Sequence, residues 1–217
     1  MIAVTTVDWV PPFAHGLLRD LRLRWALEEA AIPYEMRYVP LNGRDAPDYR
    51  ARQPFGQIPV YEEDGKEMFE TGAVLLHLAE KSGALAPADP AEKTDMTVWL
   101  FAALNTIEPH LQQLVMLDRF HKDKDWQAGA RAETSAMAAK RLGELGAALG
   151  DQEYLAAGRF TVADIAMTTV LRIIGHTDMV ESIPALGAYK ARCEARPAFQ
   201  KSLADQLADI AAHTPKA

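Results

Sequence analysis

The feature of the sequence that most limits its possible folds is a proline placed directly before a short apolar strand. Residues 55–61 read Phe-Gly-Gln-Ile-Pro-Val-Tyr, and residues 68–74 read Met-Phe-Glu-Thr-Gly-Ala-Val. Together they predict two short strands around a turn over 62–66, followed by a helix that opens with an acid and a hydroxyl. Because a proline there leaves one strand edge unpaired, an extended peptide with a zwitterionic end group would fit this region.

Composition and charge argue against several classes of protein. The 217 residues are 49% hydrophobic and 24% charged, which is ordinary for one large or two small globular domains. A net charge of −7 argues against a nucleic-acid partner. No apolar run is long enough to predict a membrane span, and residues 1–7 lack the pattern of a signal peptide. The single cysteine, Cys193, cannot form an internal disulfide, so we expect a structural thiol in a cytoplasmic protein.

Hydrophobic periodicity predicts two domains of different class. Residues 1–83 read as strand, helix, strand, helix, strand, strand and helix, which is typical of a thioredoxin-like α/β domain. The first helix is expected over 16–30, and residues 84–90, with two prolines, read as a linker. Residues 91–217 predict an all-α domain with helices over 91–121, 125–149, 161–174, 183–196 and 199–212.

Several motifs together make the chain resemble the cytosolic glutathione S-transferases over essentially its whole length. The motifs are Gly56-Gln57-Ile58-Pro59, Glu70-Thr71, a Thr161–Asp164 pair with the spacing of a capping box, and Ala195-Arg196-Pro197-Ala198-Phe199. The resemblance implies a thioredoxin-like N-terminal domain, an all-helical C-terminal domain and a homodimer.

The resemblance also implies a binding site for glutathione as co-substrate. Pro59 is expected to follow a cis peptide bond, which leaves the amide and carbonyl of Ile58 free to pair with the cysteinyl residue of glutathione. Glu70 would bind the γ-glutamyl ammonium, and Thr71 with the first amides of its helix would bind the carboxylate. Gln57 and Gln53 would contact the glycyl side or the peptide backbone.

The segment in which these enzymes carry a catalytic Tyr, Ser or Cys departs from the family pattern. Residues 8–20 contain none of the three. The amides of Leu17, Leu18 and Arg19 and the charge of Arg19 would stabilise a glutathione thiolate, which is the nucleophile. His15 would donate a hydrogen bond or act as a base. In the alternative interpretation, Arg19 pairs with Asp20 or a surface acid.

Residues for the second substrate are expected in both domains. Phe13 and Trp9 would wall the pocket, and Phe101, Asn105 and His110 would line it, ordinary helix packing being the alternative for the last three. No histidine pair or acidic cluster has the spacing of metal ligands, so no metal is expected.

The predicted function is therefore transfer of glutathione to small electrophiles, a detoxification chemistry. The alternatives are a non-catalytic binding or scaffold protein of the same fold, and a glutathione-dependent isomerase, peroxidase or reductase.

Overall fold

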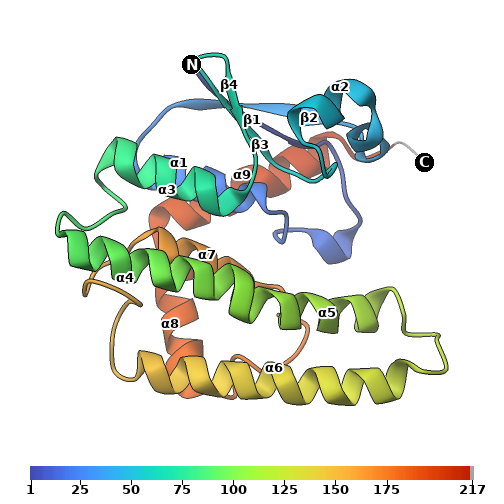
Figure 1. Cartoon of the computed structure of the whole chain (residues 1–217). Coiled ribbons are helices and arrows are strands. Elements are labelled where there is room, and N and C mark those ends of the chain that lie inside the picture. Colours follow the sequence, from blue (N-terminus) through green and yellow to red (C-terminus); the bar gives the residue numbers. More distant parts are fainter. Residues whose placement is uncertain (216–217) are drawn as a thin grey trace. The chain divides into compact units, whose positions relative to one another are not determined.

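The computed structural model describes residues 1–215, which fall into two compact units. The first unit contains Met1–Leu85 and the chain from Arg196 onward, and the second contains Ala86–Ala195. Figure 1 shows the mixed α/β character of the first unit and the helical character of the second. The predicted fold class, an α/β thioredoxin-like domain with an all-α domain, is confirmed.

The first unit is built on a four-stranded mixed sheet in the order β2-β1-β3-β4. Strand β1 (Ile2–Val7) runs parallel to β2 (Tyr34–Val39) and antiparallel to β3 (Val60–Glu63). A tight turn at Asp64 and Gly65 joins β3 to β4 (Lys66–Met68), as the alternation of the sequence predicts. The remaining elements are α1 (Asp20–Glu29), α2 (Pro47–Arg52), α3 (Thr71–Ser82) and the short 3-10 segments η1 (Pro12–Ala14) and η2 (Leu41–Asp45).

Helix α1 begins at Asp20, four residues later than the periodicity predicts. Two prolines open η1, and Gly16 has a φ of 71°, which is incompatible with a continuous right-handed helix. The amide of Leu17 donates to the carbonyl of Ala14 at 3.1 Å. The expectation that Leu17 supplies a free amide to an anion is therefore wrong.

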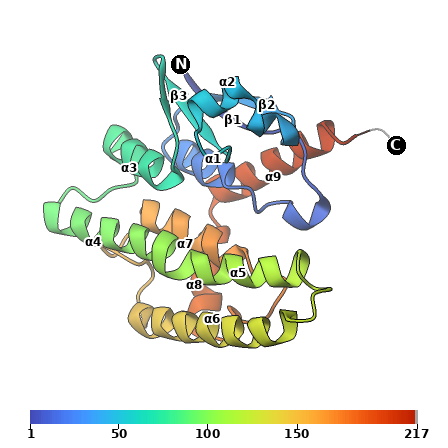
Figure 2. The same ribbon diagram turned by 45° about the vertical axis from the view of Figure 1, so that its right-hand side comes forward.

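Helices α1, α3 and α9 (Pro197–Ala212) lie along one face of this sheet, as the two views in Figures 1 and 2 agree. Trp25 of α1 packs edge-on against Phe199 of α9, with ring centroids 4.8 Å apart. Arg196 donates to both carboxylate oxygens of Glu29, at 2.6 and 2.8 Å. By these contacts α9 belongs to the first unit, whereas the sequence analysis grouped it with the helical domain.

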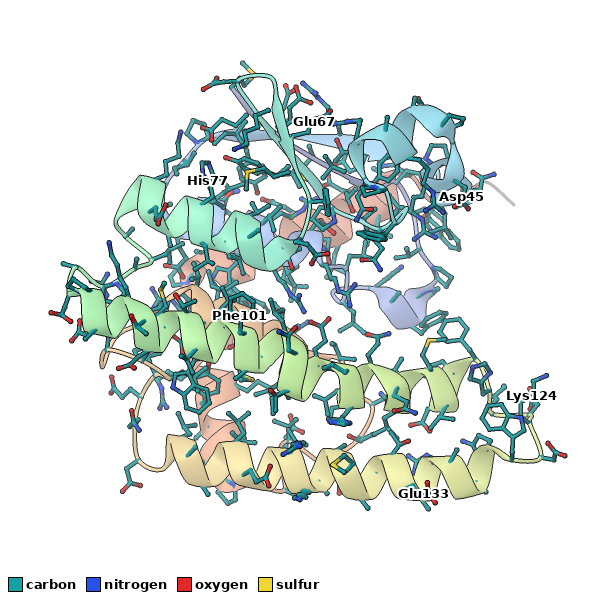
Figure 3. All side chains as sticks on the ribbon, in the orientation of Figure 1. Asp45, Glu67, His77, Phe101, Lys124 and Glu133 are labelled. Carbon is teal, nitrogen blue, oxygen red and sulfur yellow. The ribbon has the colours of Figure 1, made fainter. Side chains whose placement is uncertain are left out.

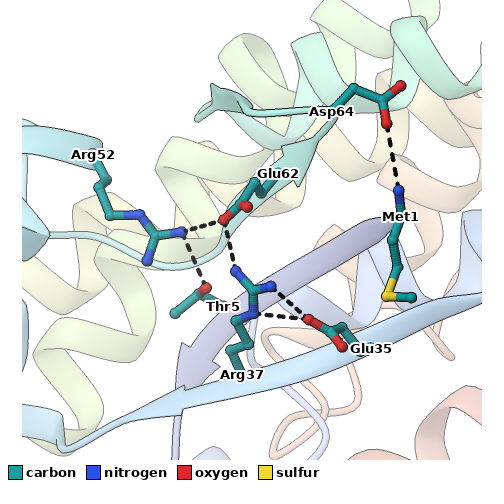
Figure 4. A network of polar contacts seen from close by, with 7 residues as sticks. All are labelled: Met1, Thr5, Glu35, Arg37, Arg52, Glu62 and Asp64. Atoms are coloured by element: carbon teal, nitrogen blue, oxygen red, sulfur yellow. Dashed lines mark hydrogen bonds and ion pairs between the residues drawn. The ribbon is translucent and has the colours of Figure 1, made fainter.

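The opposite face of the sheet carries a network of charged side chains, drawn in Figure 4. Arg37 on β2 contacts Glu35 at 2.6 Å and Glu62 at 2.8 Å. Arg52, at the end of α2, reaches Glu62 at 3.3 Å and the hydroxyl of Thr5 at 3.5 Å. Ion pairs at a protein surface contribute only about 0–1 kcal/mol each, so this network adds little to the stability of the fold.

The second unit consists of helices only, within the part of the chain that the structure describes. Helices α4 (Pro90–Phe101) and α5 (Glu108–Arg119) are joined by a π-helical segment, η3 (Ala102–Ile107), which interrupts the predicted helix over 91–121. Pro109 lies in the first turn of α5 and has no amide hydrogen, so it cannot donate an α-helical hydrogen bond. The loss of this bond accounts for the π-helical segment that precedes α5. The other helices are α6 (Gln127–Leu149), α7 (Val162–Arg172) and α8 (Pro184–Glu194).

The predicted capping box at the start of α7 is confirmed. Asp164 accepts hydrogen bonds from the amide of Thr161 at 2.9 Å and the amide of Leu155 at 3.0 Å. The hydroxyl of Tyr189 on α8 donates to the same carboxylate at 2.9 Å. The box therefore ties α7 to the preceding loop and to α8.

Two further properties concern the described residues as a whole. Over 1–215, each helix is too short or too polar to cross a bilayer. The same residues hold no group of three or more His, Cys, Asp or Glu side chains placed to bind a metal ion.

Candidate functional site

The β3–β4 hairpin brings the two predicted ligand-binding motifs to the same end of the sheet. Tyr61 lies opposite Met68 in the antiparallel register. The residues just before β3 and just after β4 are therefore neighbours across the hairpin. These are Ile58 and Pro59 on one side and Glu70 and Thr71 on the other, so the fold joins segments that the sequence separates by about ten residues.

Ile58 offers unpaired main-chain atoms at this end. The Ile58–Pro59 peptide bond is cis, as the resemblance implies. Within residues 1–215, neither the amide nor the carbonyl of Ile58 forms a hydrogen bond. Main-chain donors and acceptors without a protein partner are bonded to water or to a ligand. An extended peptide can pair with both atoms of Ile58 as a one-residue strand addition.

The turn that precedes Ile58 is held by two side chains and contains a glycine with a positive φ. Gln53 is buried, and its Oε1 accepts from the amide of Phe55 at 2.7 Å. The hydroxyl of Tyr49 donates to the carbonyl of Gln57 at 2.7 Å, and burial raises the pKa of Tyr49, so this hydroxyl stays protonated. Gly56 has a φ of 61°, and a Cβ there would lie 2.7 Å from the guanidinium carbon of Arg50. The positive φ favours glycine at position 56, whereas the exposed Arg50 side chain can move away from a Cβ.

The side chains of Gln53 and Gln57 face different surroundings. Gln53 is buried, and its Oε1 already accepts a hydrogen bond within the turn, whereas Gln57 is exposed. Of the two predicted contacts to the glycyl side, only Gln57 presents an exposed side chain.

Glu70 has an unusual backbone conformation at the start of α3. Its φ is 68° and its ψ is 103°, a backbone conformation that residues other than glycine rarely adopt. It occupies the N-cap position, but its side chain makes no capping bond, and the residue is exposed. Strained residues of this kind cluster at ligand-binding sites, because the surrounding fold must hold them in place. The conformation leaves the carboxylate available to a cationic group.

Thr71 is the first residue of α3 and is almost buried. Its Oγ1 accepts a hydrogen bond from Nη1 of Arg22 at 3.1 Å. The amides of Thr71, Gly72 and Ala73 have no hydrogen-bond acceptor within residues 1–215, whereas the amide of Val74 donates to the carbonyl of Glu70. Unsatisfied amides at the start of a twelve-residue helix favour an anion such as a carboxylate.

The two predicted catalytic residues lie in the segment before α1. Arg19 occupies the N-cap position of α1 and is half-buried. The ring of His15 is held by a 3.0 Å hydrogen bond between Nε2 and the carbonyl of Val10. Because a carbonyl only accepts, Nε2 carries the hydrogen, and Nδ1 of the neutral ring is the atom able to take up a proton. The structure thus leaves one ring nitrogen of His15 for acid–base work.

Asp20 is not the partner of Arg19 that the alternative interpretation named. The buried carboxylate of Asp20 accepts from the hydroxyl of Thr6 at 3.1 Å and from Nε of Arg24 at 2.8 Å. These two hydrogen bonds tie the carboxylate of Asp20 to β1 and to the next turn of α1.

The residues predicted for a second substrate are distributed over both units. Phe13 is exposed on η1 of the first unit. Phe101, labelled in Figure 3, lies on α4. About half of it is exposed, at 52%. Asn105 is exposed in η3, and His110 is half-buried on α5, so these three follow one another along a single helical stretch.

A hollow of about 600 Å³ lies elsewhere in the first unit, between α1, β2 and α9. Its charged residues are already paired: Glu28 and Asp205 both contact Lys201 at 2.7 Å, and Asp209 contacts Arg24 at 2.7 Å. None of the predicted site residues lines it. Cys193 also plays no part in the site, because it is buried in α8 and burial raises the pKa of its thiol to about 12.

Sequence reasoning missed two residues that shape the site, Arg22 and Tyr49. Both are buried. Arg22 lies between Leu21 and Leu23 and was not among the predicted site residues. A signal was present, because Leu21 to Leu27 is an unbroken buried run in which two arginines need internal partners. Tyr49 carries no motif and is found only through its contact.

Comparison with known proteins places both units in one family. The model for the glutathione S-transferase N-terminal domain matches residues 13–80, and that for the C-terminal domain matches residues 104–197. A probable glutathione S-transferase from Oryza sativa subsp. japonica is 30% identical over 190 residues, covering 81% of this chain and 86% of that protein. Glutathione S-transferase 4 from Zea mays is 28% identical over 226 residues, covering 99% of this chain and 97% of that protein.

Solved structures show the same fold. A glutathione transferase family member from Pseudomonas fluorescens pf-5, crystallised with two glutathione bound, has a TM-score of 0.79 at 25% identity and covers 93% of this chain and 92% of its own. A glutathione transferase from Burkholderia graminis, with two glutathione molecules bound per subunit, also has a TM-score of 0.79, at 26% identity. It covers 93% of this chain and 87% of its own.

Proposed function

The chain belongs to the cytosolic glutathione S-transferase family, and from this premise we propose that it joins glutathione to small electrophilic substrates. Glutathione is the co-substrate, bound at the hairpin end that carries Ile58, Glu70 and Thr71. The free buried thiol of Cys193 fits a reducing, cytoplasmic location.

The observation that carries the proposal is the meeting of three complementary features at one end of the hairpin. Ile58 has an unpaired amide and carbonyl, Glu70 has an exposed carboxylate, and α3 begins at Thr71 with unpaired amides. Glutathione offers a cysteinyl backbone, an ammonium and a carboxylate. Each of these three groups thus has a partner of matching hydrogen-bonding character or opposite charge.

The chemical step requires the thiolate of glutathione. The charge of Arg19 and the start of α1 favour the ionised sulfur, and Nδ1 of His15 takes up the thiol proton. With an aryl halide, the sulfur forms a bond to carbon while the carbon–halogen bond breaks and halide leaves. With an enone, the sulfur adds to the β-carbon and a proton returns to the α-carbon, so each reaction balances without a redox cofactor.

Residues for the second substrate are proposed in each unit separately. Phe13 and Trp9 are the candidates in the first unit, and Phe101, Asn105 and His110 are the candidates in the second. A homodimer would bury other exposed groups, namely Phe55 in the first unit and Val98 in the second. Light scattering would report twice the chain mass of 23.9 kDa if the protein is a dimer.

A non-catalytic binding protein of the same fold is the second candidate. It is favoured by the absence of Tyr, Ser and Cys from residues 8–20, where these enzymes carry a catalytic group. Such a protein would bind glutathione without promoting ionisation of its thiol. Isomerase, peroxidase and reductase activities share the proposed glutathione site and differ in the second substrate.

The deciding experiment combines binding with turnover. Calorimetry measures glutathione binding, ultraviolet difference spectra measure thiolate formation, and a panel of aryl halides, enones and hydroperoxides measures turnover. The proposal predicts binding, a lowered thiol pKa and turnover of at least one class. Binding without thiolate formation or turnover would establish the scaffold function, and absence of binding would refute both.

A further inference from the structure

Helix α9 carries a buried glutamine on the face that packs into the first unit. The buried residues of this helix, spaced three or four apart, are Phe199, Ser202, Gln206 and Ile210. Gln206 is 1% exposed, and its Nε2 donates to the carbonyl of Leu18 at 3.5 Å. Its Oε1 has no hydrogen-bond partner within residues 1–215. The side-chain amide is therefore satisfied at the nitrogen and unsatisfied at the oxygen.

The contact with Leu18 determines how the amide of Gln206 is oriented. The carbonyl of Leu18 is an acceptor, and it also accepts from the amide of Leu21 at 3.1 Å. The opposite orientation of the glutamine would place two acceptor oxygens against each other. An unpaired buried acceptor costs as much as, or more than, one neutral hydrogen bond contributes. Gln206 is therefore a poor source of stability for the fold, and its contact with Leu18 needs another explanation.

Leu18 lies where the direction of the chain matters for the proposed chemistry. It directly precedes Arg19, which is the N-cap residue of α1 and the proposed positive charge beside the glutathione sulfur. The hydrogen bonds from Gln206 and Leu21 hold the planar peptide group that joins Leu18 to Arg19. Holding this group limits the directions in which the side chain of Arg19 can extend.

An apolar contact joins α9 to the same segment. Ile210, one turn after Gln206, forms a buried cluster with Val7 and Val10. The partly buried side chains packed against this cluster come from the segment before α1, from β2 and from the proposed glutathione-binding edge, and they are Trp9, Ala14, Leu18, Val39 and Ile58. Helix α9 thus contacts the segment before α1 in two ways, and one of these contacts also includes the side chain of Ile58.

We propose that Gln206 is a positioning residue for the ionised sulfur of glutathione, acting from α9 through Leu18 and Arg19. This inference rests on the proposed transfer of glutathione. Gln206 does not touch the peptide. It holds the turn before α1 so that the charge of Arg19 stays directed at the sulfur, whereas binding of the peptide itself depends on Ile58 and the residues after β4.

The test measures ionisation of the bound thiol separately from binding of the peptide. Ultraviolet difference spectra over a pH series give the thiol pKa of bound glutathione. Calorimetry with S-methylglutathione, which has no thiol, gives the affinity for the peptide alone. Gln206→Met keeps an unbranched side chain of similar length and removes the Nε2 donor.

The expected effect of Gln206→Met is a raised thiol pKa with unchanged peptide binding. A neutral hydrogen bond corresponds to about a 3- to 10-fold change in an equilibrium constant. We therefore expect the ionisation constant of the bound thiol to fall at least about 3-fold and the affinity for S-methylglutathione to change less than about 2-fold. The rise of turnover with pH should move to higher pH by the same amount as the thiol pKa.

Ser202→Ala is the matched control. Ser202 is also fully buried on α9, and its Oγ has no partner in the described part of the chain, so it makes no hydrogen bond to the segment before α1. This variant should keep both the thiol pKa and the affinity for S-methylglutathione. Urea unfolding confirms that each variant is folded, and Gln206→Leu, with the same expected result, carries the test if Gln206→Met does not fold.

The outcomes distinguish the inference from the function on which it rests. A raised thiol pKa in Gln206→Met with unchanged affinity for S-methylglutathione supports the positioning role. An unchanged thiol pKa, an equal loss of affinity for S-methylglutathione, or the same rise in Ser202→Ala overturns it while leaving glutathione transfer intact. If the wild type does not bind glutathione, or binds it without lowering its thiol pKa, the proposed transfer is wrong and the inference fails with it.

Discussion

A threonine lies at the start of α7, where Thr161 is the N-cap, and at the start of α3, where Thr71 is the first residue. The two helices nevertheless satisfy their first amides in opposite ways. The first amides of any helix lack internal partners. At α7 the protein supplies them: Thr161 and Asp164 form a reciprocal capping box in a fully buried setting. At α3 no side chain caps the helix, and Thr71 instead accepts from Arg22.

The difference supports our proposal that the start of α7 serves the fold and the start of α3 serves a ligand. Asp164 accepts hydrogen bonds from the loop before α7 and from Tyr189. Removing its carboxylate should therefore lower the free energy of unfolding. Glu70 is exposed and held at a φ of 68°. We therefore interpret the capped start of α7 as a stabilising feature of the fold and the uncapped, strained start of α3 as part of the proposed glutathione site.

The largest change in stability should come from removing the capping box at the start of α7. Asp164→Ala would leave the amides of Leu155 and Thr161 and the hydroxyl of Tyr189 buried without an acceptor. Each such group costs about 1–3 kcal/mol, so we expect the free energy of unfolding to fall by about 3–5 kcal/mol. Urea unfolding measures this, and Asp164→Asn, which keeps one acceptor oxygen, should lose less. A loss below about 1 kcal/mol would show that the box is not a folding device.

Replacing the two threonines by valine should separate stability from binding. Thr71→Val should weaken glutathione about 10- to 100-fold and change the unfolding free energy by no more than about 1 kcal/mol. Thr161→Val should lower the unfolding free energy by about 1–2 kcal/mol and leave glutathione affinity unchanged. Calorimetry and urea unfolding of the same two proteins give both quantities. If the two variants behaved alike, the distinction between the helix starts would fail.

The smallest effect concerns the strained backbone of Glu70. Glycine adopts a positive φ without penalty, so Glu70→Gly should raise the unfolding free energy by about 1 kcal/mol while glutathione binding weakens. Asp64 is a matched control, because it also has a positive φ, of 50°, and is exposed in the β3–β4 turn. Asp64→Gly should gain similar stability and keep its affinity for glutathione. Loss of stability in Glu70→Gly would mean that the conformation carries no strain.

The sequence predicted what local patterns determine. The hairpin around Asp64 and Gly65, the strand Tyr34–Val39 and the capping box at Thr161 follow from alternation, turn residues and cap spacing, and the structure confirms all three. The cis bond before Pro59 was predicted from the resemblance. These features depend on residues that are close together in the chain.

The sequence could not predict features that depend on distant contacts. The contact from Arg22 to Thr71 spans 49 residues. The apolar residues around Arg22 indicate that it needs an internal partner, but they do not identify which one. The packing of α9 against α1 depends on Trp25 meeting Phe199, which no local pattern encodes. The start of α1 at Asp20 was misplaced because Gly16 fits helical spacing in sequence but has a positive φ in the fold.

Amide hydrogen exchange tests the open helix start most directly. With saturating glutathione, we expect slower exchange at Ile58 and at Thr71, Gly72 and Ala73, because the bound peptide would accept hydrogen bonds from these amides. The first turn of α7, which the capping box already satisfies, should show no change. Unchanged exchange at the start of α3 while glutathione is bound would contradict the assignment of this helix start as the ligand site.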